Sequence, residues 1–221
     1  MHGDYKNAFD QTKQLINQGR SRLINEAVNK LVKNSIRNTM EYAYELWSRG
    51  EQNIVKDHFP IQFRMLLDEN KVKLIFHRDN LAMKLGAAVD GSGDRIAYGD
   101  SEDKTSDKVS WKFVPLAEDN RVYFKIANVK NHQYLKLGVQ EDGSGEHNVY
   151  GASETDTPRH QFYLQPSNLN GEVVFYIFNR EYHQALKLGR AIDSMGDRQV
   201  YSHKGSVVGS PELWAWYVLA W

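Results

Sequence analysis

The pattern of apolar and polar positions changes once along this chain, near residue 70. Before that point, apolar residues recur every three or four positions, the spacing of one face of an α-helix. After it, apolar and polar residues alternate in short runs that are separated by turns rich in Gly and Asp. The pattern therefore predicts helices over residues 4 to about 70 and short strands from Val72 onward.

The helical part contains signals for several separate helices. Residues 23–32 have the clearest helical periodicity, and Gly50 suits the end of a further helix. Pro60 suits the first turn of a last helix over residues 61–67. Four or five helices of this length can bury a small core, so we expect an all-α helix bundle over residues 1–70.

The second part contains one hairpin three times. Each copy has an apolar-Lys-Leu-Gly strand, a turn that begins and ends with an acid, and a second strand that carries a Tyr. The Gly of the first strand recurs as Gly86, Gly138 and Gly189, so the period is 52 and then 51 residues. Self-similarity at a fixed period is typical of a repeat architecture.

A further strand precedes and follows each hairpin, which makes about four strands per repeat and about twelve in all. Three such repeats favour a β-trefoil, a six-stranded barrel capped at one end by three hairpins. A propeller blade also has four strands, but propellers have four to eight blades. We therefore predict an α+β, two-domain protein: an N-terminal all-α helix bundle over residues 1–70, then a C-terminal β-trefoil over residues 71–221. The predicted repeats span about 72–120, 121–171 and 172–221.

Composition excludes several classes of protein. Lys plus Arg and Asp plus Glu both number 28, so the formal net charge is zero and no basic footprint for nucleic acid is expected. No apolar run is long enough for a transmembrane helix. The first residues, Met1-His2-Gly3-Asp4, are polar, so no signal peptide is expected in this chain. Cys is absent, which excludes disulfides, thiolate metal sites and Cys nucleophiles.

Several long motifs are unusual in their composition. They are Arg37-Asn38-Thr39-Met40, Phe59-Pro60-Ile61-Gln62-Phe63-Arg64, Asp103-Lys104-Thr105-Ser106, Val109-Ser110-Trp111-Lys112-Phe113, Arg121-Val122-Tyr123-Phe124-Lys125-Ile126 and Asn179-Arg180-Glu181-Tyr182. These motifs resemble stretches of the low-molecular-weight (30K) lipoproteins of lepidopteran haemolymph, and the likeness covers nearly the whole chain after the first twenty or so residues.

The resemblance implies a helical part joined to a β-trefoil, secretion into haemolymph, and storage or carriage of lipid or other small apolar molecules. It also implies, as an alternative, recognition of glucose or glucan in immune responses, through the trefoil. It brings no catalytic residue and no cofactor, so we do not expect an enzyme. The expected partner is a small apolar ligand or a sugar, bound to a monomer.

The hairpins carry candidate carbohydrate-binding residues. A small apolar residue precedes each Tyr, so the Tyr faces outward when its neighbour faces the barrel. Aromatic rings stack on the apolar faces of sugars, and acids accept hydrogen bonds from their hydroxyls. The structural alternative is a Tyr that only covers its hairpin and pairs its hydroxyl locally. The candidates are Asp94 and Tyr98, Glu146 and Tyr150, and Asp197 and Tyr201.

An apolar ligand has a second set of candidates among the aromatic residues. Tyr44, Trp47 and Phe63 lie in the helical part, and Trp111 of the first repeat would face the junction of the two parts together with Trp214. Ordinary core packing is the alternative for each of them. The mean hydropathy of −0.63 favours an enclosed pocket over a wide apolar surface. The eight His residues have no spacing typical of a metal site, so no metal is expected.

Overall fold

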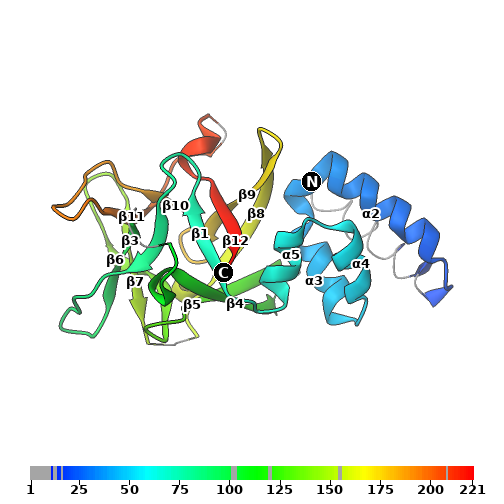
Figure 1. Cartoon of the computed structure of the whole chain (residues 1–221), viewed down its shortest axis with the longest axis horizontal. Coiled ribbons are helices and arrows are strands. Elements are labelled where there is room, and N and C mark those ends of the chain that lie inside the picture. Colours follow the sequence, from blue (N-terminus) through cyan, green and yellow to red (C-terminus); the bar gives the residue numbers. More distant parts are fainter. Residues whose placement is uncertain are drawn as a thin grey trace.

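The computed structural model describes residues 11, 14, 15, 17–100, 104–118, 121–153, 156–207 and 209–221. Twelve β-strands form one sheet in this part of the chain, and helices lie at one end of it (Figure 1). Four α-helices have their bounds within the described residues. They are α2 (Ser21–Ser35), α3 (Met40–Ser48), α4 (Gln52–His58) and α5 (Ile61–Leu67).

Six of the strands form a closed barrel. Each pairs antiparallel with two others, in the cyclic order β1, β4, β5, β8, β9, β12 and back to β1. Closure leaves no free edge along the barrel. The barrel strands are β1 (Val72–Phe76), β4 (Ser110–Glu118), β5 (Arg121–Asn128), β8 (Phe162–Leu169), β9 (Glu172–Asn179) and β12 (Trp216–Ala220).

The other six strands form three hairpins that cap one end of the barrel. The second strands of the hairpins also pair with one another, β3 with β7, β7 with β11 and β11 with β3, which places them around a pseudo-threefold axis. Barrel and cap together make a β-trefoil. The cap strands are β2 (Ala82–Leu85), β3 (Arg95–Asp100), β6 (Gln133–Glu141), β7 (His147–Ala152), β10 (Ala185–Leu188) and β11 (Arg198–His203).

The turn of each cap hairpin is held by its first acid. Asp90 Oδ1 accepts hydrogen bonds from the backbone N–H groups of Ser92 and Asp94, at 2.8 and 3.0 Å. The same two bonds recur at Asp142 and Asp193. Such Asx turns explain why the repeat keeps an Asp at this position.

Two tryptophans join the cap to the barrel. Trp111 and Trp216 are fully buried at equivalent points of β4 and β12. Their indole N–H groups donate to the backbone carbonyls of Met83 and Leu186 in the cap, at 2.8 and 3.1 Å. Phe162, which has no such donor, occupies the third equivalent point. The barrel interior is therefore filled by large aromatic side chains from all three repeats.

The predicted all-α helix bundle is wrong. Apolar side chains of the helices belong to the same hydrophobic cluster as the barrel interior, and Phe63 of α5 lies with its ring centroid 5.8 Å from that of Phe175 in β9. Helix α3 packs against β5 and β8, and α5 packs against β4 and β12. The protein is therefore mostly β, with helices of 7 to 15 residues covering the barrel end opposite the cap (Figure 1).

One reason for this arrangement is the small apolar face that α2 and α4 offer. Only one residue of α4, Val55, is buried, and α2 buries Ile24 and Val28 among exposed polar neighbours. Helices this short gain most of their stability from tertiary packing. Covering the barrel end buries the apolar residues of both parts at once, so no separate all-α domain forms.

Candidate functional site: a groove on the third repeat

The acids predicted to bind sugar are ion-paired across repeats. Each belongs to the turn of one hairpin and meets the Lys of the next hairpin around the axis. Their side chains are between 8 and 13% exposed, so each acid is largely enclosed by its neighbours. The three pairs are Lys84 with Asp197, Lys136 with Asp94, and Lys187 with Glu146.

The tyrosines predicted to bind sugar each cover the Gly of their own hairpin. A β-carbon added to Gly189 would come within 2.8 Å of Cε2 of Tyr201. The same holds for Gly86 beneath Tyr98, at 2.9 Å, and for the corresponding pair of the second repeat. The close approach explains why each hairpin has Gly at this position.

The structure brings the tyrosines together on the outer face of the cap. Tyr98 lies opposite Gln199 in the pairing of β3 with β11, and Tyr201 lies opposite Asn148 in the pairing of β11 with β7. Burial raises the pKa of Tyr201, and the acids Asp142 and Glu146 raise it further. Burial likewise raises the pKa of Tyr98. Three separate subsites were expected from the sequence, whereas the rings surround one axis.

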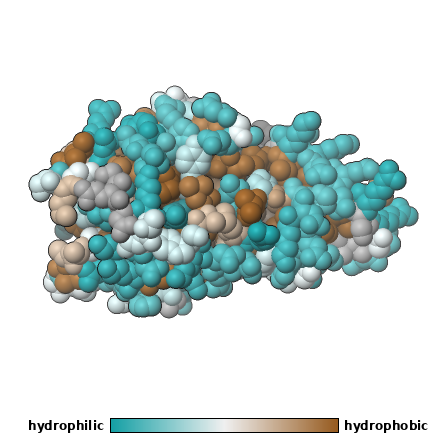
Figure 2. Space-filling model, viewed as in Figure 1, coloured by the Kyte–Doolittle hydropathy of each residue, from teal (hydrophilic) through white to brown (hydrophobic). Residues whose placement is uncertain are grey.

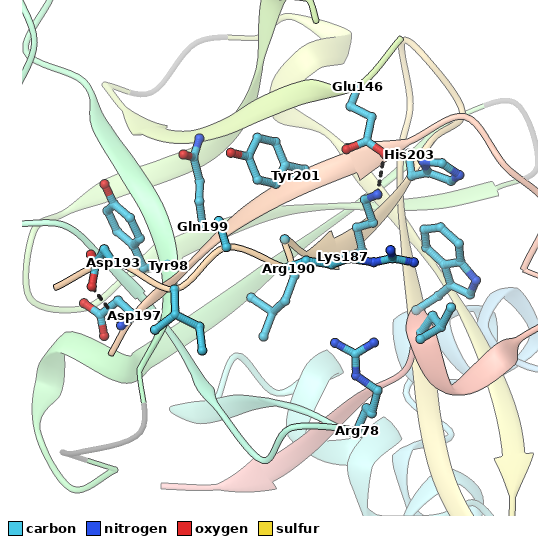
Figure 3. Close-up of a pocket in the computed structure, with 16 residues that line it drawn as sticks. Arg78, Tyr98, Glu146, Lys187, Arg190, Asp193, Asp197, Gln199, Tyr201 and His203 are labelled. Carbon is cyan, nitrogen blue, oxygen red and sulfur yellow. Dashed lines mark hydrogen bonds and ion pairs between the residues drawn. The ribbon is translucent and has the colours of Figure 1, made fainter. Parts of the chain in front are cut away.

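A groove of about 620 Å³ lies on this face, over the third repeat (Figure 3). Its size is within the usual range for sites that bind small molecules. Four of the six predicted carbohydrate-binding residues line it: Tyr98, Glu146, Asp197 and Tyr201. Asp94 and Tyr150 are not part of its lining.

A charged cluster forms part of the groove wall. Glu146 accepts a hydrogen bond from the ammonium group of Lys187, and its Oε1 also lies 2.5 Å from Nδ1 of His203. The His203 ring stacks on Trp214, with the ring centroids 4.7 Å apart and the planes 25° apart. The carboxylate of Glu146 therefore already has two partners from the third repeat.

Three residues of the groove differ in type from the residues at the equivalent positions of the other two repeats. Arg190 corresponds to Ala87 and Val139, and His203 corresponds to Asp100 and Ala152. Trp214 follows the short helix η4 (Pro211–Leu213), at the point where the other repeats have Val109 and His160. Residues that recur three times serve the common architecture, whereas these three differ from it. In the sequence, the signal for these three residues is that each departs from the residue type found at the same position of the other repeats.

The groove has two chemically different ends. In Figure 3, Asp193 and Asp197 lie with Tyr98 at one end, and Arg78 and Arg190 lie at the other. The acid end offers hydrogen-bond acceptors beside aromatic rings. The arginine end offers positive charge beside an apolar wall that includes Leu213 and Trp214.

The residues predicted to hold an apolar ligand are placed apart from this groove. Phe63 and Trp111 are fully buried in the shared core, where Phe63 also contacts the ring of Phe59. Tyr44 and Trp47 are half-buried on α3, and the ammonium group of Lys56 lies 5.7 Å from the Trp47 ring centroid. All four side chains therefore lie in the hydrophobic core or pack against it, and none of them lines the groove.

Two general features of the described residues limit the chemistry. They contain no cluster of three or more His, Asp or Glu side chains that could hold a metal ion. None of their helices is long and apolar enough to cross a membrane.

The fold and the groove define a β-trefoil protein with helices over one barrel end and a ligand-sized groove on its cap. The chain belongs to the lepidopteran low molecular weight (30 kD) lipoprotein family, whose model matches residues 1–220. It is 62% identical to microvitellogenin of Manduca sexta over 218 residues, 99% of this chain and 88% of the relative. It is 46% identical to low molecular mass lipoprotein 3 of Bombyx mori, over 98% of this chain and 85% of the relative. The resemblance seen in the sequence is therefore confirmed.

Solved structures of low identity share the fold. An SDF2-like protein from Arabidopsis thaliana matches 68% of this chain and 92% of its own, with a TM-score of 0.56 and 11% identity. The designed threefold-symmetric protein ThreeFoil matches 68% of this chain and 99% of its own, with a TM-score of 0.52 and 17% identity. At these identities the likeness concerns the trefoil alone.

Proposed function

We propose that this protein is a secreted, non-enzymatic storage and carrier protein of haemolymph that holds a small apolar molecule in the groove on its third repeat. The observation that supports this proposal most directly is the apolar wall of the groove. Leu188, Leu213 and Trp214 line it, and Ile192 is 60% exposed at its rim. Membership in a family of lipoproteins supports the same function.

The amount of lipid carried is small. Figure 2, which has the view of Figure 1, shows hydrophilic residues over most of the visible face, with hydrophobic residues mainly over its middle. A wide lipid-covered surface requires a contiguous apolar patch, and the mean hydropathy of −0.63 argues against one. The groove of about 620 Å³ suits one small molecule.

Native mass spectrometry of the protein from its natural source tests the carrier function. We expect a co-purifying apolar molecule that reloads the recombinant protein after extraction. Leu213→Gln should weaken reloading, because it places an amide in the apolar wall. Leu23→Gln is the matched control, since Leu23 is a partly exposed leucine of α2 at the other end of the molecule. A protein without bound ligand that also fails to reload would contradict the proposal.

The alternative is carbohydrate recognition at the acid end of the groove. The observation that favours it is the grouping of Tyr98, Gln199 and Tyr201 beside Asp193 and Asp197. Rings and hydroxyl-binding acids in one place are the chemistry that sugars require. A glycan-array signal that is lost in Tyr98→Ala would support recognition, and its absence in the unmodified protein would exclude it.

A further inference from the structure

Positive charge is in excess at the arginine end of the groove. Arg78 Nη2 lies 2.7 Å from Oδ2 of Asp79, and Arg198 Nη1 lies 3.2 Å from Oδ1 of the same carboxylate. Arg190 makes no ion pair or hydrogen bond with any described residue. Two guanidinium groups therefore share one carboxylate and that of Arg190 has none, whereas the other groove cation, Lys187, is neutralised by Glu146.

The two groove arginines come from different repeats and point into the same space. Arg190 follows Gly189 at the start of the third cap turn, and Arg78 lies in the loop between β1 and β2. Figure 3 shows both guanidinium groups directed into the groove at the end away from Asp193 and Asp197. A planar guanidinium group with free N–H donors is suited to binding a carboxylate through two parallel hydrogen bonds.

An apolar wall adjoins the arginines. Trp214 is 6% exposed and packs with Leu213 in a hydrophobic cluster separate from the main core. The buried indole N–H of Trp214 has no hydrogen-bond acceptor among the described residues. This N–H is enclosed and takes no part in the groove, so Leu213 and Trp214 offer a ligand only apolar surface beside the arginines.

We propose that the groove binds an anionic amphiphile, a molecule with a carboxylate head and an apolar chain. The head lies on Arg190 and Arg78, and the chain lies along Leu213 and Trp214. This inference rests on the proposed carrier function and adds the charge of the ligand and the residue that selects it. An uncharged apolar molecule of the same length gains no binding affinity from the charge of Arg190.

The chain provides a mild way to remove this charge. Arg190→Ala gives the third repeat the residue that the first repeat already has there, Ala87. The two turns share their backbone hydrogen bonds, from Asp90 N to Asp94 O and from Asp193 N to Asp197 O, both at 2.9 Å. The variant should therefore fold normally, which its thermal midpoint can verify.

Isothermal titration calorimetry of the full chain with decanoate and with decanol tests the inference. We expect decanoate to bind and Arg190→Ala to weaken it by about tenfold or more, because a charge-assisted hydrogen bond is lost. Decanol should bind more weakly and equally to both proteins. Arg22→Ala, which removes an exposed arginine of α2, should leave decanoate binding unchanged.

Other outcomes separate this inference from the carrier function. Equal decanoate affinity in Arg190→Ala and in the unmodified protein would overturn the role of Arg190. Equal affinity for decanol and decanoate, both weakened by Leu213→Gln, would overturn the anionic preference and leave the carrier function standing. Binding of neither probe would overturn both.

Discussion

Lys84 in the first cap hairpin forms an ion pair with Asp197 in the turn of the third, with Nζ and Oδ2 2.7 Å apart. The same relationship holds from the second repeat to the first and from the third to the second. The pairs therefore form a closed cycle around the pseudo-threefold axis. Charge and backbone pairing together hold the three hairpins in one arrangement.

Removing one Lys from this cycle should destabilise the whole protein. Lys84→Met leaves Asp197 and Asp100 without the cation that both contact, at 2.7 and 2.8 Å. Because the Lys84 side chain is only 15% exposed, we expect the free energy of unfolding to fall by about 3 kcal/mol, measured by urea denaturation at neutral pH. Lys130→Met, at an exposed lysine in the loop between β5 and β6, should change it by less than about 0.5 kcal/mol.

The same ion pairs predict a loss of stability at alkaline pH. Burial alone lowers the pKa of Lys84, but hydrogen bonds to Asp100 and Asp197 outweigh it and hold the pKa above its usual value. A raised pKa stabilises the folded state fully below the unfolded value of about 10.4, and this contribution disappears as the pH rises through the folded value. Unfolding curves above about pH 10 should show this loss in the unmodified protein and less of it in Lys84→Met. Identical pH dependence in the two proteins would contradict the assignment.

Gly151 should not tolerate a larger residue. A β-carbon there would come within 2.2 Å of Cδ1 of Leu85, which is buried in the cap of the neighbouring repeat. Leu85 must repack, so we expect Gly151→Ala to cost about 1–3 kcal/mol in thermal or urea unfolding. Gly143→Ala is the control, because nothing lies within 4 Å of a β-carbon at that turn position. A similar effect of both substitutions would argue against the close packing.

Helices and barrel should unfold together. Phe63 of α5 is fully buried and contacts Phe175 of the barrel, so Phe63→Ala should lower the free energy of unfolding by about 3–5 kcal/mol. Far-ultraviolet circular dichroism and tryptophan fluorescence should report one coincident transition. Ile61→Ala, which changes a side chain on the same helix that is 55% exposed, should cost much less. Two separate transitions would contradict this expectation and show that the helices unfold as an independent unit.

Acid should destabilise the protein through His160. Burial of this residue, aided by Lys136 and Arg159, lowers the pKa of His160 from 6.5 to about 4. The folded state therefore resists protonation, so stability is complete above about pH 6.5 and falls by about 3 kcal/mol as the pH drops to about 4. His160→Gln should reduce this fall, measured as the difference between urea midpoints near neutral pH and near pH 4. An unchanged difference would show that other groups cause the acid sensitivity.

Strands and turns were predictable because their signals are local. Alternation of apolar and polar residues identifies a strand from five or six positions, and the Asp of each cap turn bonds only to residues two and four positions ahead. The repeat of these signals led to about twelve expected strands, and the described residues contain twelve. The helices were also visible in the apolar spacing, although that spacing does not say what covers an apolar face.

The candidate site was predictable only in part, for a related reason. Tyr98 and Tyr201 were identified because they recur in the repeat, and they do line the groove. Trp214 was expected at the junction with the helical part, whereas it lines the groove. Arg190 was missed because it does not recur in the repeat. The cyclic pairing of Lys84 with Asp197 was also missed, since these residues lie in different repeats.

The order of amino acids alone was sufficient for the strands, the turns and the period of the repeat, since each depends on residues a few positions apart. Tertiary structure decided that the helices close the barrel, that each Lys meets an acid of another repeat, and that Arg78 and Arg190 share one groove. These contacts join segments distant in the chain, and they exist only once the barrel has closed around its axis.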